Sequence, residues 1–466
     1  MVFWPFVFSL LLLIFSTSKG IAGHVARTGE VVNIADVYAD PRFNREIDRQ
    51  TGYTTHNMLA MPIISKGAVI GVVQMVNKRN GPRFSSADES AFKTFAVYCA
   101  LALHISKAYR DMRHQQNLFN VAREMVGYYT QCSAEEVEAL LADPFPRNFP
   151  EDFFKITYDC KGHENQMVKQ MVYMFYDLFG TARFDLETLC RFVLSVKKSY
   201  RHAVPYHNFA HGFFVCHCLY LVLRELRWEL FTENEALTLM VAALCHDVDH
   251  RGKNNSFLQK LNEPLWHIYS GSVMEKHHFQ CTVGILQKQG HDLFGSMGSE
   301  EYKEALGMVR TAILDTDLLQ FLPAQKKVAK WLEDGVFDVN NPEHRGEFIS
   351  ILMTACDLNS MCKQQECHIR EVSLLYEEFY KQGDEEKLHG VEPLPMMDRS
   401  QKDKIPSQQV GFIKHICIPC YTTIVHILPF MQPMLDGLQR NLEYWQSLQN
   451  KEAMWEPEKS RPTPES

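Results

Sequence analysis

The sequence predicts an all-α domain of roughly 300 residues, preceded by a smaller α+β region. Between about residues 150 and 450, apolar side chains recur at three- and four-residue spacing, and strand-like alternation is sparse. Before residue 108, two short apolar runs are joined by turn residues, which is typical of a β-hairpin. The helical region is long enough to bury its apolar faces by packing helix on helix.

The composition limits the classes of function. The chain has 466 residues, of which 46% are hydrophobic, as expected for two or three globular domains. The formal net charge is −8 without a strongly basic block, so nucleic-acid binding is not expected. The 13 cysteines are scattered, and several lie within apolar helical patterns, which indicates free thiols in a reducing, cytoplasmic compartment.

Residues 1–20 form an apolar N-terminal segment whose role is open. The apolar run is short for a membrane span, and small and polar residues follow it. Its length fits a signal peptide, although a positive n-region and an Ala-x-Ala site are absent. We keep three interpretations: a signal or membrane anchor, an ordinary buried segment, or an artefact at the start of the chain.

Residues 21–108 are predicted to form the α+β region. The strand candidates are residues 31–34, 58–64 and 69–76. Ser65-Lys66-Gly67-Ala68 joins the last two as a hairpin turn. Ser86 then begins a long helix with Asp88 and Glu89 in its first turn, where acids suit the helix dipole.

Residues 109–150 are charged and are predicted to form a linker helix that ends at prolines. Leu118, Val121 and Met125 recur at helical spacing and form one apolar stripe. The stripe could be the seam of a homodimer or could pack on a neighbouring domain. After the helical domain of residues 151–450, the polar tail of residues 451–466 is expected to be disordered.

Residues of the metal-ligand type gather in the helical domain. His207 and His211 are four residues apart and would share one face of a helix. His246-Asp247 and Asp357 each follow an apolar run, and such groups are costly to bury unless they are paired or bind a metal. A mixed His/Asp set suits zinc with magnesium or manganese, and a metal pair can activate water for phosphoryl displacement. Separate, internally bonded core residues are the alternative interpretation.

The helical domain resembles the class I cyclic nucleotide phosphodiesterases. The matching boxes, in the order of that family, are Tyr206-His207-Asn208 with His211, His246-Asp247-x-Asp249-His250-Arg251-Gly252, Asn254-Asn255, Glu275-x-His277-His278-Phe279, Thr316-Asp317-Leu318, Thr354-Ala355-Cys356-Asp357-Leu358, Met396-Met397-Asp398-Arg399 and Gln409-Val410-Gly411-Phe412. Residues 71–78, 99–104 and 418–423 look most like the family-10 branch, which carries GAF domains and is regarded as hydrolysing both cAMP and cGMP. The resemblance implies the helical fold of HD-type phosphodiesterases.

The α+β region resembles the back half of a GAF domain, a module that senses small ligands. Asn77-Lys78, Phe84 and Asp88-Glu89 fit the spaced signature of cyclic-nucleotide-binding GAF domains. The region is shorter than a whole GAF domain. We therefore expect a truncated GAF-like domain, which is either a structural remnant or a working nucleotide sensor.

The resemblance implies a role for each matched residue. The implied ligands of two divalent metal ions, zinc with magnesium or manganese, are His211, His246, Asp247 and Asp357, with Asp247 bridging the two. The implied catalytic groups are His207 as the proton donor and His250, Glu275 and His278 as a supporting shell. The implied substrate-binding residues are Tyr206, His207, Asp247, Asp357, Gln409 and Phe412. In that set, Gln409 would hydrogen-bond the purine edge and Phe412 would stack on its face.

The expected activity is metal-dependent hydrolysis of the 3′,5′-cyclic phosphate of cAMP, cGMP or both to the 5′-monophosphate. The alternative is a non-hydrolysing regulatory protein that binds cyclic nucleotides. A third interpretation, an HD phosphohydrolase of nucleoside triphosphates, leaves Gln409 and Phe412 unexplained. Three departures from the family bear on substrate preference: Phe209 where Trp is usual, Asp315 where a small residue is usual, and residues 361–366 in place of a Thr-Lys-Pro-Trp segment.

Overall fold

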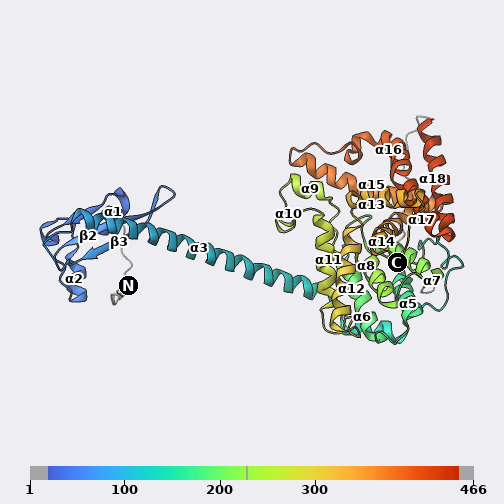
Figure 1. Ribbon diagram of the computed structural model, residues 1–466, viewed down its shortest axis with the longest axis horizontal. Coiled ribbons are helices and arrows are strands. Elements are labelled where there is room, and N and C mark those ends of the chain that lie inside the picture. The colour runs from blue at the N-terminus through green and yellow to red at the C-terminus, as the bar shows by residue number, and fades with distance from the viewer. Residues whose placement is uncertain (1–18, 227–228, 451–466) are drawn as a thin grey trace, which may run out of the picture. The chain divides into compact units, whose positions relative to one another are not determined.

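The computed structural model describes residues 19–226 and 229–450, with the side chains of residues 118–129 left out. The backbone divides into two units, Met1–Met125 and Val126–Ser466, which Figure 1 shows in blue and in green to red. The predictions for the apolar segment before residue 19 and for the tail of residues 451–466 lie outside the described residues.

The N-terminal unit is built on a three-stranded antiparallel sheet in the order β1-β2-β3. Its elements are α1 (Gly20–Thr28), β1 (Val32–Ile34), η1 (Val37–Ala39), α2 (Arg45–Thr51), β2 (Met58–Ser65), β3 (Ala68–Val76) and the first part of α3 (Ser86–Tyr129). The predicted hairpin is confirmed, because Ser65 pairs with Ala68 across the two-residue turn. Lys66 and Gly67 have φ angles of 49° and 79°, the positive values that such a turn requires.

The GAF-type signature residues bond to their own unit. The Asn77 side chain accepts a hydrogen bond from the His56 backbone N–H at 2.6 Å and donates one to the Thr54 carbonyl at 2.7 Å. Lys78 forms an ion pair with Asp88 in the first turn of α3. These contacts tie the end of β3 to the preceding loop and to α3, so the signature has a structural role in this unit.

Helix α3 is continuous over 44 residues, from Ser86 to Tyr129. The backbone therefore has no break near residue 108, where the sequence suggested the end of one domain and the start of a linker. The helix ends before Ser133, which begins α4 (Ala134–Ala142) with a capping box. The apolar stripe predicted at residues 118–125 lies among side chains outside the described set.

The described residues of the second unit are helical, as the spacing of apolar side chains predicted. After α4 come η2 (Glu164–Gln166), α5 (Met167–Phe179), α6 (Leu186–Ser199), α7 (Phe209–Leu226), α8 (Glu233–Cys245), α9 (Asn255–Lys260), α10 (Pro264–Ile268), α11 (Val273–Leu286), α12 (Ser299–Leu314) and α13 (Leu318–Glu333). The remaining elements are α14 (Pro342–Asp357), η3 (Leu358–Cys362), α15 (Gln365–Leu388), η4 (Pro395–Met397), η5 (Arg399–Lys404), α16 (Ile405–Phe412), the π-helical turn η6 (Ile413–Cys417), α17 (Ile418–Ile427), η7 (Pro429–Met431) and α18 (Gln432–Asn450).

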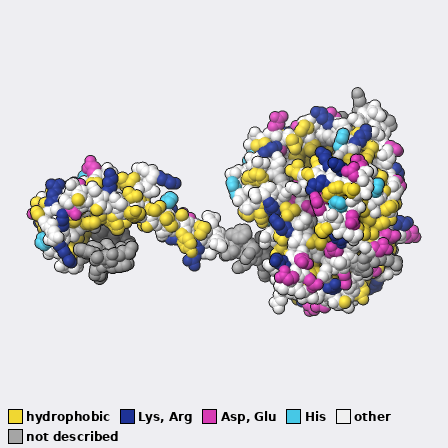
Figure 2. All heavy atoms as spheres, viewed as in Figure 1, with side chains coloured by type: hydrophobic (Ala, Val, Ile, Leu, Met, Phe, Trp, Pro, Cys, Tyr) yellow, Lys and Arg dark blue, Asp and Glu magenta, His cyan; other side chains and the backbone are white. Residues whose placement is uncertain are grey.

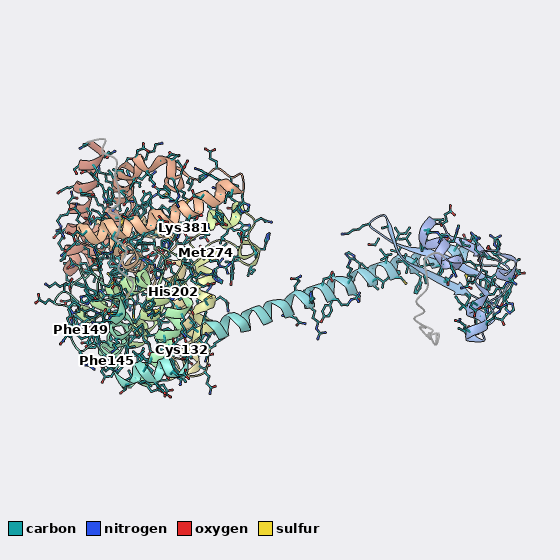
Figure 3. The ribbon with its side chains drawn as sticks, turned by 180° about the vertical axis from the view of Figure 1, so that it is seen from behind. Cys132, Phe145, Phe149, His202, Met274 and Lys381 are labelled. Carbon is teal, nitrogen blue, oxygen red and sulfur yellow. The ribbon has the colours of Figure 1, made fainter. Side chains whose placement is uncertain are left out.

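The segment before residue 151 belongs to the helical unit. Glu136 of α4 pairs with Lys198 of α6 at 2.6 Å. After α4, the rings of Phe145 and Phe149, labelled in Figure 3, pack against Tyr173 of α5. The nearby prolines end the helix as expected, but these aromatic contacts anchor the chain to the core. The helical unit thus extends further toward the N-terminus than residue 151.

The centre of the helical unit is formed by α7, α8 and α14. Every residue of α8 from Ala236 to Cys245 is buried. A Cβ atom at Gly212 of α7 would lie 2.6 Å from the Tyr200 hydroxyl oxygen and 3.1 Å from the Leu244 carbonyl oxygen, so this glycine permits the close approach of α7 and α8. The described cysteines are free, and eleven of the thirteen are buried, Cys417 and Cys420 among them.

Two described stretches of the helical unit, Phe209–Leu226 and Arg399–Ile427, are long and apolar enough to pass a compositional test for membrane spans. The first is 78% buried inside the unit, and the second joins several short helices across a kink. Core helices pass the same test, so neither stretch supports a membrane association.

Candidate metal centre and active site

Three helix ends bring the predicted metal ligands together. His211 lies in the first turn of α7, His246 and Asp247 follow the last residue of α8, and Asp357 is the last residue of α14. Each of these helices contains a long apolar run, and the burial of that run carries the polar residues at the helix end into the interior. The four side chains come from segments up to 146 residues apart, since 357 − 211 = 146.

The ligand atoms of these four residues converge. Nε2 of His211 lies 2.9 Å from Oδ1 of Asp357, 3.1 Å from Nε2 of His246 and 3.5 Å from Oδ2 of Asp247. Nε2 of His246 lies 3.2 Å from both Oδ2 of Asp247 and Oδ1 of Asp357. Each of the two imidazoles therefore lies close to both carboxylates.

Five of the six distances between these four ligand atoms are close to those of a tetrahedral metal site. Ligand atoms bound at zinc distances of about 2.0–2.2 Å lie roughly 3.3–3.6 Å apart in a tetrahedron. The observed separations of 2.9–3.5 Å fall within a few tenths of an ångström of that range. The Nδ1–H group of His246 donates to the Ala243 carbonyl at 2.9 Å, which turns Nε2 toward the other ligands.

The charges at the centre favour ionised aspartates. Burial alone would raise the pKa of Asp247, but the neighbouring His246 and His207 hold this pKa well below its usual range. The pKa of Asp357 is lowered in the same way by His246 and His211, again against the effect of burial. Two ionised carboxylates beside two imidazoles form the donor set that a divalent cation requires.

The predicted supporting residues lie on the other side of Asp247. Nε2 of His278 is 3.6 Å from Oδ1 of Asp247, and its Nδ1–H donates to the Val248 carbonyl at 2.7 Å. His250 belongs to the same group of potential ligands, and burial together with the charge of His207 lowers its pKa to about 4. Both imidazoles are thus neutral near pH 7, the form that can accept hydrogen bonds or bind a metal.

Glu275 also faces this region from the first turn of α11. Its Oε2 accepts a hydrogen bond from the Asn255 side chain at 2.9 Å. Burial raises the pKa of Glu275 to about 7, and the charges of Asp317 and Asp247 add to the rise. The carboxyl group can therefore exchange a proton near neutral pH.

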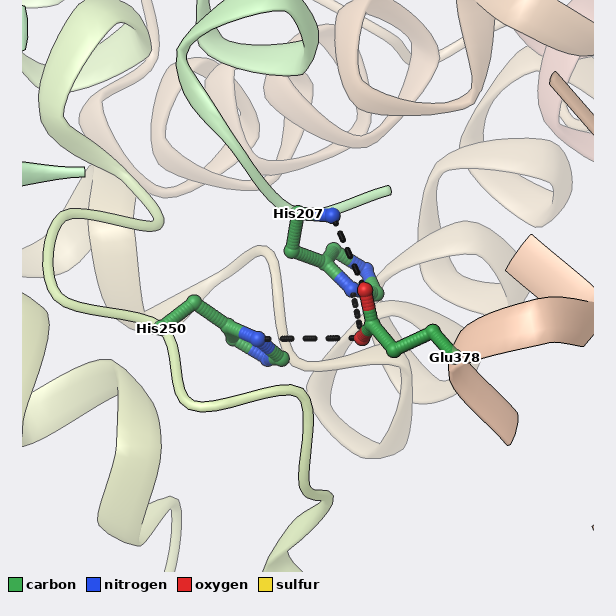
Figure 4. Close-up of side chains that lie close together, drawn as sticks. All are labelled: His207, His250 and Glu378. Carbon is green, nitrogen blue, oxygen red and sulfur yellow. Dashed lines mark hydrogen bonds and ion pairs between the residues drawn. The ribbon is translucent and has the colours of Figure 1, made fainter. Parts of the chain in front are cut away.

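His207, the predicted proton donor, forms a close pair with Glu378 of α15. Figure 4 shows the Glu378 carboxylate beside the His207 ring, with the His250 ring also within reach of it. Nδ1 of His207 lies 2.6 Å from Oε1 of Glu378, and Oε2 accepts hydrogen bonds from the backbone N–H groups of Tyr206 and His207, each at 3.1 Å. The carboxylate therefore fixes both the ring and the backbone of the proposed acid.

The electrostatics of this pair keep the imidazole protonated. Burial lowers the pKa of His207, but the charges of Glu378 and Asp247 outweigh that effect and raise it to about 9. For Glu378, burial acts to raise the pKa, and the His207 charge and hydrogen bond bring it down to about 2. The pair is thus a partly buried ion pair with its acidic proton held on the imidazole.

Glu378 was missed by sequence reasoning. It lies in the Glu377-Glu378 pair of a helix that also carries several exposed acids, and only one residue of this pair is buried. A signal does exist, because Glu371, Glu378, Gln382 and Glu386 are all buried and recur on one face of α15. A polar stripe on the inner face of a helix indicates an internal network.

A second group missed by sequence reasoning holds the loop after Asp247. Asp249 has a positive φ of 62° and accepts hydrogen bonds from Arg201 Nε and His277 Nε2, both at 2.7 Å. Such a backbone angle is unfavourable for a residue other than glycine and persists only when neighbours hold it. These bonds therefore position Asp247 and His250 on either side of the strained residue.

The site opens into a cavity of 440 Å³. Ten of the eleven predicted site residues line it: Tyr206, His207, His211, Asp247, His250, Glu275, His278, Asp357, Gln409 and Phe412. The eleventh, His246, does not line the cavity but belongs to the group of potential metal ligands with His211 and Asp247. Further lining comes from apolar residues of α11 and α15, among them Met274, which Figure 3 labels. A cavity with a polar end and an apolar wall suits a ligand that joins a phosphate to an aromatic base.

Gln409 presents an unpaired acceptor to this cavity. Its Nε2 donates to the Tyr376 hydroxyl at 3.4 Å, and that hydroxyl donates to Oε1 of Gln408 at 2.9 Å. Oε1 of Gln409 is buried and has no hydrogen-bond partner among the described residues. A buried acceptor left open in this way is satisfied when a ligand supplies a donor.

The three departures from the family have different surroundings. Phe209 is buried in the first turn of α7. Asp315 lies outside the cavity lining, near Glu347 and Ser350 of α14. In the segment of residues 361–366, Met361 lines the cavity, whereas Lys363 is buried and donates to the carbonyls of Ile156 and Tyr158. Only Met361 of that segment therefore reaches the cavity.

Comparisons with known proteins agree with this geometry. Residues 206–438 match the family model described as 3′,5′-cyclic nucleotide phosphodiesterase, and residues 7–103 match the GAF domain model. The chain is 46% identical over 438 residues to the probable 3′,5′-cyclic phosphodiesterase pde-5 of Caenorhabditis elegans, covering 93% of this chain and 59% of that protein. It is 36% identical over 446 residues to the cGMP-specific 3′,5′-cyclic phosphodiesterases of Drosophila virilis and Drosophila melanogaster, covering 94% of this chain and 50% and 40% of those proteins.

The chain thus spans about half the length of the curated relatives it matches. Half of its own residues fall within the phosphodiesterase family model, and that half contains every residue of the metal centre and the His207–Glu378 pair. The GAF match covers the N-terminal unit. The family is metal-dependent, in keeping with the grouped His and Asp side chains. The chain belongs to the class I 3′,5′-cyclic nucleotide phosphodiesterases that carry a GAF domain.

Proposed function

We propose that this chain hydrolyses the 3′,5′-cyclic phosphate of cAMP, cGMP or both to the 5′-monophosphate, and so ends cyclic-nucleotide signalling. The observation that carries the proposal is the meeting of two His and two Asp donor atoms beside a partly buried His207–Glu378 pair. A protein that only binds cyclic nucleotides needs neither a metal centre nor a proton donor held in place.

Zinc is our proposal for the site of His211, His246, Asp247 and Asp357. Two imidazoles and two carboxylates form a donor set typical of zinc, and each imidazole lies within 3.5 Å of both carboxylates. We propose magnesium or manganese for a second site that shares Asp247, because a hard cation of this kind accepts one or two carboxylates and completes its shell with water. When bound, the two ions supply an activated water molecule and neutralise phosphate charge.

The protein groups would divide the remaining work. His207 would give its Nε2 proton to the departing O3′ oxygen, with Glu378 holding the ring by its Nδ1–H group. His250, His278 and Glu275 would orient water and phosphate oxygens around the metals. At the other end, Phe412 would stack on the purine, and Gln409 would accept a hydrogen bond from its edge through the unpaired Oε1.

The choice between cAMP and cGMP is a separate proposal. The Drosophila relatives bear the name cGMP-specific, whereas the name of the Caenorhabditis elegans relative specifies no base. The family-10 resemblance favours hydrolysis of both nucleotides. We therefore propose that both are substrates, with the rates unequal.

The test is hydrolysis of cAMP and cGMP by the purified full chain, with and without added Mg²⁺ or Mn²⁺ after chelation. Turnover of either nucleotide that disappears on chelation and returns with metal supports the proposal. An absence of turnover by protein of confirmed metal content would instead favour the regulatory, nucleotide-binding interpretation.

We also propose that the chain forms a homodimer through α3. Tyr98, Leu101, Ile105 and Met112 are 55–65% exposed and follow each other at spacings of three, four and seven residues. This heptad spacing produces one apolar stripe on a helix. Figure 2 shows hydrophobic side chains along the visible surface of the N-terminal unit. A stripe of this length is unusual on a helix that stays in water.

A cytoplasmic location is our last proposal. It is supported by the free cysteines, most of which are buried in the described residues and would be reduced in that compartment. Membrane or secretory targeting by residues 1–20 remains a prediction. Fractionation of cells that express the full chain, with and without residues 1–20, tests both statements.

A further inference from the structure

The short helix η3 forms part of the cavity wall. It directly follows the proposed metal ligand Asp357, and the side chains of Ser360 and Met361 line the cavity from it. The segment of residues 361–366, which departs from the family, begins within η3. The contacts that hold η3 therefore bear on how this chain shapes its substrate site.

The backbone of this wall is bound by helix α18. The Asn441 side chain donates to the carbonyl groups of Met361 and Lys363, each at 2.9 Å. A Cβ atom at Gly437 would overlap the carbonyl oxygen of Cys362, so glycine permits the close approach of α18. Gly437 and Asn441 are four residues apart, so one face of α18 makes both contacts.

His368 of α15 extends this contact to Ser360. The indole Nε1–H of Trp445, one turn after Asn441 in α18, donates to Nε2 of His368 at 2.7 Å. Because indole can only donate, Nδ1 of His368 carries the ring proton, and it donates to the Ser360 carbonyl at 3.2 Å. Burial lowers the pKa of His368 to about 4, so the ring keeps this neutral form near pH 7.

Ser360 in turn holds the side chain of Tyr206. The two hydroxyl groups share a hydrogen bond of 3.1 Å, and both residues are buried. The Tyr206 ring lies 4.8 Å from the rings of His207 and His211, measured between centroids. The backbone N–H groups of Tyr206 and His207 are bound separately, by Glu378. The series of hydrogen bonds that begins in α18 thus ends at a proposed substrate-binding side chain.

We propose that His368 is a positioning residue, which fixes the side chains of Ser360 and Tyr206 in the cavity wall and thereby raises the affinity of the site for cyclic nucleotides. This inference rests on the proposed hydrolysis of cyclic nucleotides. The hydrogen bonds of His368 run to Trp445 and Ser360, so it acts through Ser360 and not on the substrate itself. A binding side chain that is already held in place loses less conformational entropy when the ligand binds.

The test is the steady-state kinetics of His368→Leu in the metal-loaded full chain, with cAMP and cGMP as substrates. Leucine is apolar and removes both ring nitrogens. We expect KM to rise about 3–10-fold, the loss typical of one neutral hydrogen bond. Metal content and kcat should stay near the wild-type values, because the metal ligands and the His207–Glu378 pair are not part of this series. An unchanged KM would overturn the inference.

Two further variants separate positioning from a general loss of packing. His368→Gln should restore KM to near the wild-type value, because an amide can accept from the indole and donate to the Ser360 carbonyl. His291→Leu also removes a buried imidazole, but the partners of that ring, Ser195 and the Gln289 carbonyl, do not line the cavity. Its KM should stay at the wild-type value, and an equal rise in both leucine variants would contradict the inference.

A double-mutant cycle tests the route through Ser360. Ser360→Ala removes the hydroxyl that holds Tyr206 and should raise KM by itself. Adding His368→Leu to Ser360→Ala should then raise KM by much less than His368→Leu does alone, because the two changes break one series of contacts. Fully additive effects would mean that His368 does not act through Ser360, and the inference would be wrong.

The outcomes separate this inference from the proposed function. If the unmodified chain hydrolyses no cyclic nucleotide, the proposed function fails. If the chain is active and His368→Leu keeps the wild-type KM, the function stands and the positioning role is wrong. If His368→Leu does not fold, Trp445→Phe decides, because it keeps an aromatic ring and removes the N–H group that binds His368. Its KM should rise in the same way, and an unchanged KM would overturn the inference.

Discussion

His207 and Glu378 are 171 residues apart in sequence, yet Nδ1 of His207 lies 2.6 Å from Oε1 of Glu378. The carboxylate is buried, and its second oxygen binds the backbone on either side of the Tyr206–His207 peptide bond. A group placed in this way sets the orientation, the tautomer and the proton affinity of the imidazole together. Glu378 is thus a positioning residue for the proposed acid.

Glu378→Gln is expected to move the alkaline limit of activity to lower pH. A general acid must be protonated, so activity falls as pH rises through its pKa. Glu378 contributes to raising the pKa of His207 to about 9, and the neutral amide removes that contribution while keeping a hydrogen-bond acceptor. The profile of kcat/KM against pH measures the shift.

Glu377→Gln, an exposed neighbour, is the control and should retain the wild-type profile. A variant whose alkaline limb stays in place would contradict the assigned role.

His207→Ala is expected to lower kcat by roughly 10²–10⁴, the usual contribution of a positioned general acid. Bound metal should stay unchanged, because the four donor atoms of the metal centre belong to other residues. Turnover and metal content are measured on the same preparation. His426→Ala changes an exposed histidine of the same unit and should behave as wild type. Unchanged activity in His207→Ala would show that another group protonates the leaving oxygen.

Asp357→Ala is expected to lose metal and activity together. Oδ1 of Asp357 lies within 3.2 Å of Nε2 of both His211 and His246, so its removal takes away one of four donors and the charge that balances the cation. Elemental analysis of dialysed protein gives the metal content per chain. Asp334→Ala is an exposed control after α13. A variant that keeps a full complement of metal would exclude Asp357 as a ligand.

The sequence predicted the helical domain and the metal centre because both depend on local patterns. The apolar run of residues 239–245 predicted a buried helix, and His246-Asp247 directly after it had to enter the interior. The hairpin of residues 58–76 was predictable from the Lys66-Gly67 turn. Each of these patterns lies within a stretch of about twenty residues, so it can be recognised without knowledge of distant contacts.

The features that sequence reasoning missed depend on distant contacts. Glu378 looks like the exposed Glu377 beside it, and only the packing of α15 against the Tyr206–His207 segment distinguishes the two. Likewise, the prolines near residue 146 correctly predict the end of a helix, but the contacts of Phe145 and Phe149 with Tyr173 decide which unit the segment joins. Neither contact is indicated by the spacing of apolar side chains.

Asp315→Asn is expected to stabilise the protein at neutral and alkaline pH. Burial raises the pKa of Asp315 from 3.8 to about 6, and Glu347 adds to the rise while Ser350 opposes it. The folded state binds the proton more tightly than the unfolded state, so stability falls as pH rises from about 4 to about 6. Above that range the ionised group costs roughly 1–3 kcal/mol, at about 1.4 kcal/mol per pKa unit.

Thermal unfolding at two pH values measures the effect of Asp315→Asn. The midpoint of the variant should exceed that of the wild type at pH 8, and the two should coincide at about pH 3, below the pKa of Asp315 in both states. Asp334→Asn, at an exposed position, should show no such pH-dependent difference. A difference of equal size at both pH values would mean that the charge of Asp315 is not its cause.

Ile105→Asp in α3 is expected to dissociate the proposed homodimer. Ile105 is 58% exposed and lies at the centre of the stripe formed by Tyr98, Leu101 and Met112, so a charge there would be buried without a partner in a helix–helix seam. Light scattering of the full chain should give the mass of a dimer for the wild type and of a monomer for the variant.

Lys107→Asp places the same charge on the opposite face of α3 and should remain dimeric, which separates loss of the seam from a general effect of negative charge. A wild-type chain that is monomeric at micromolar concentration would rule out the seam, and the stripe would then need another partner.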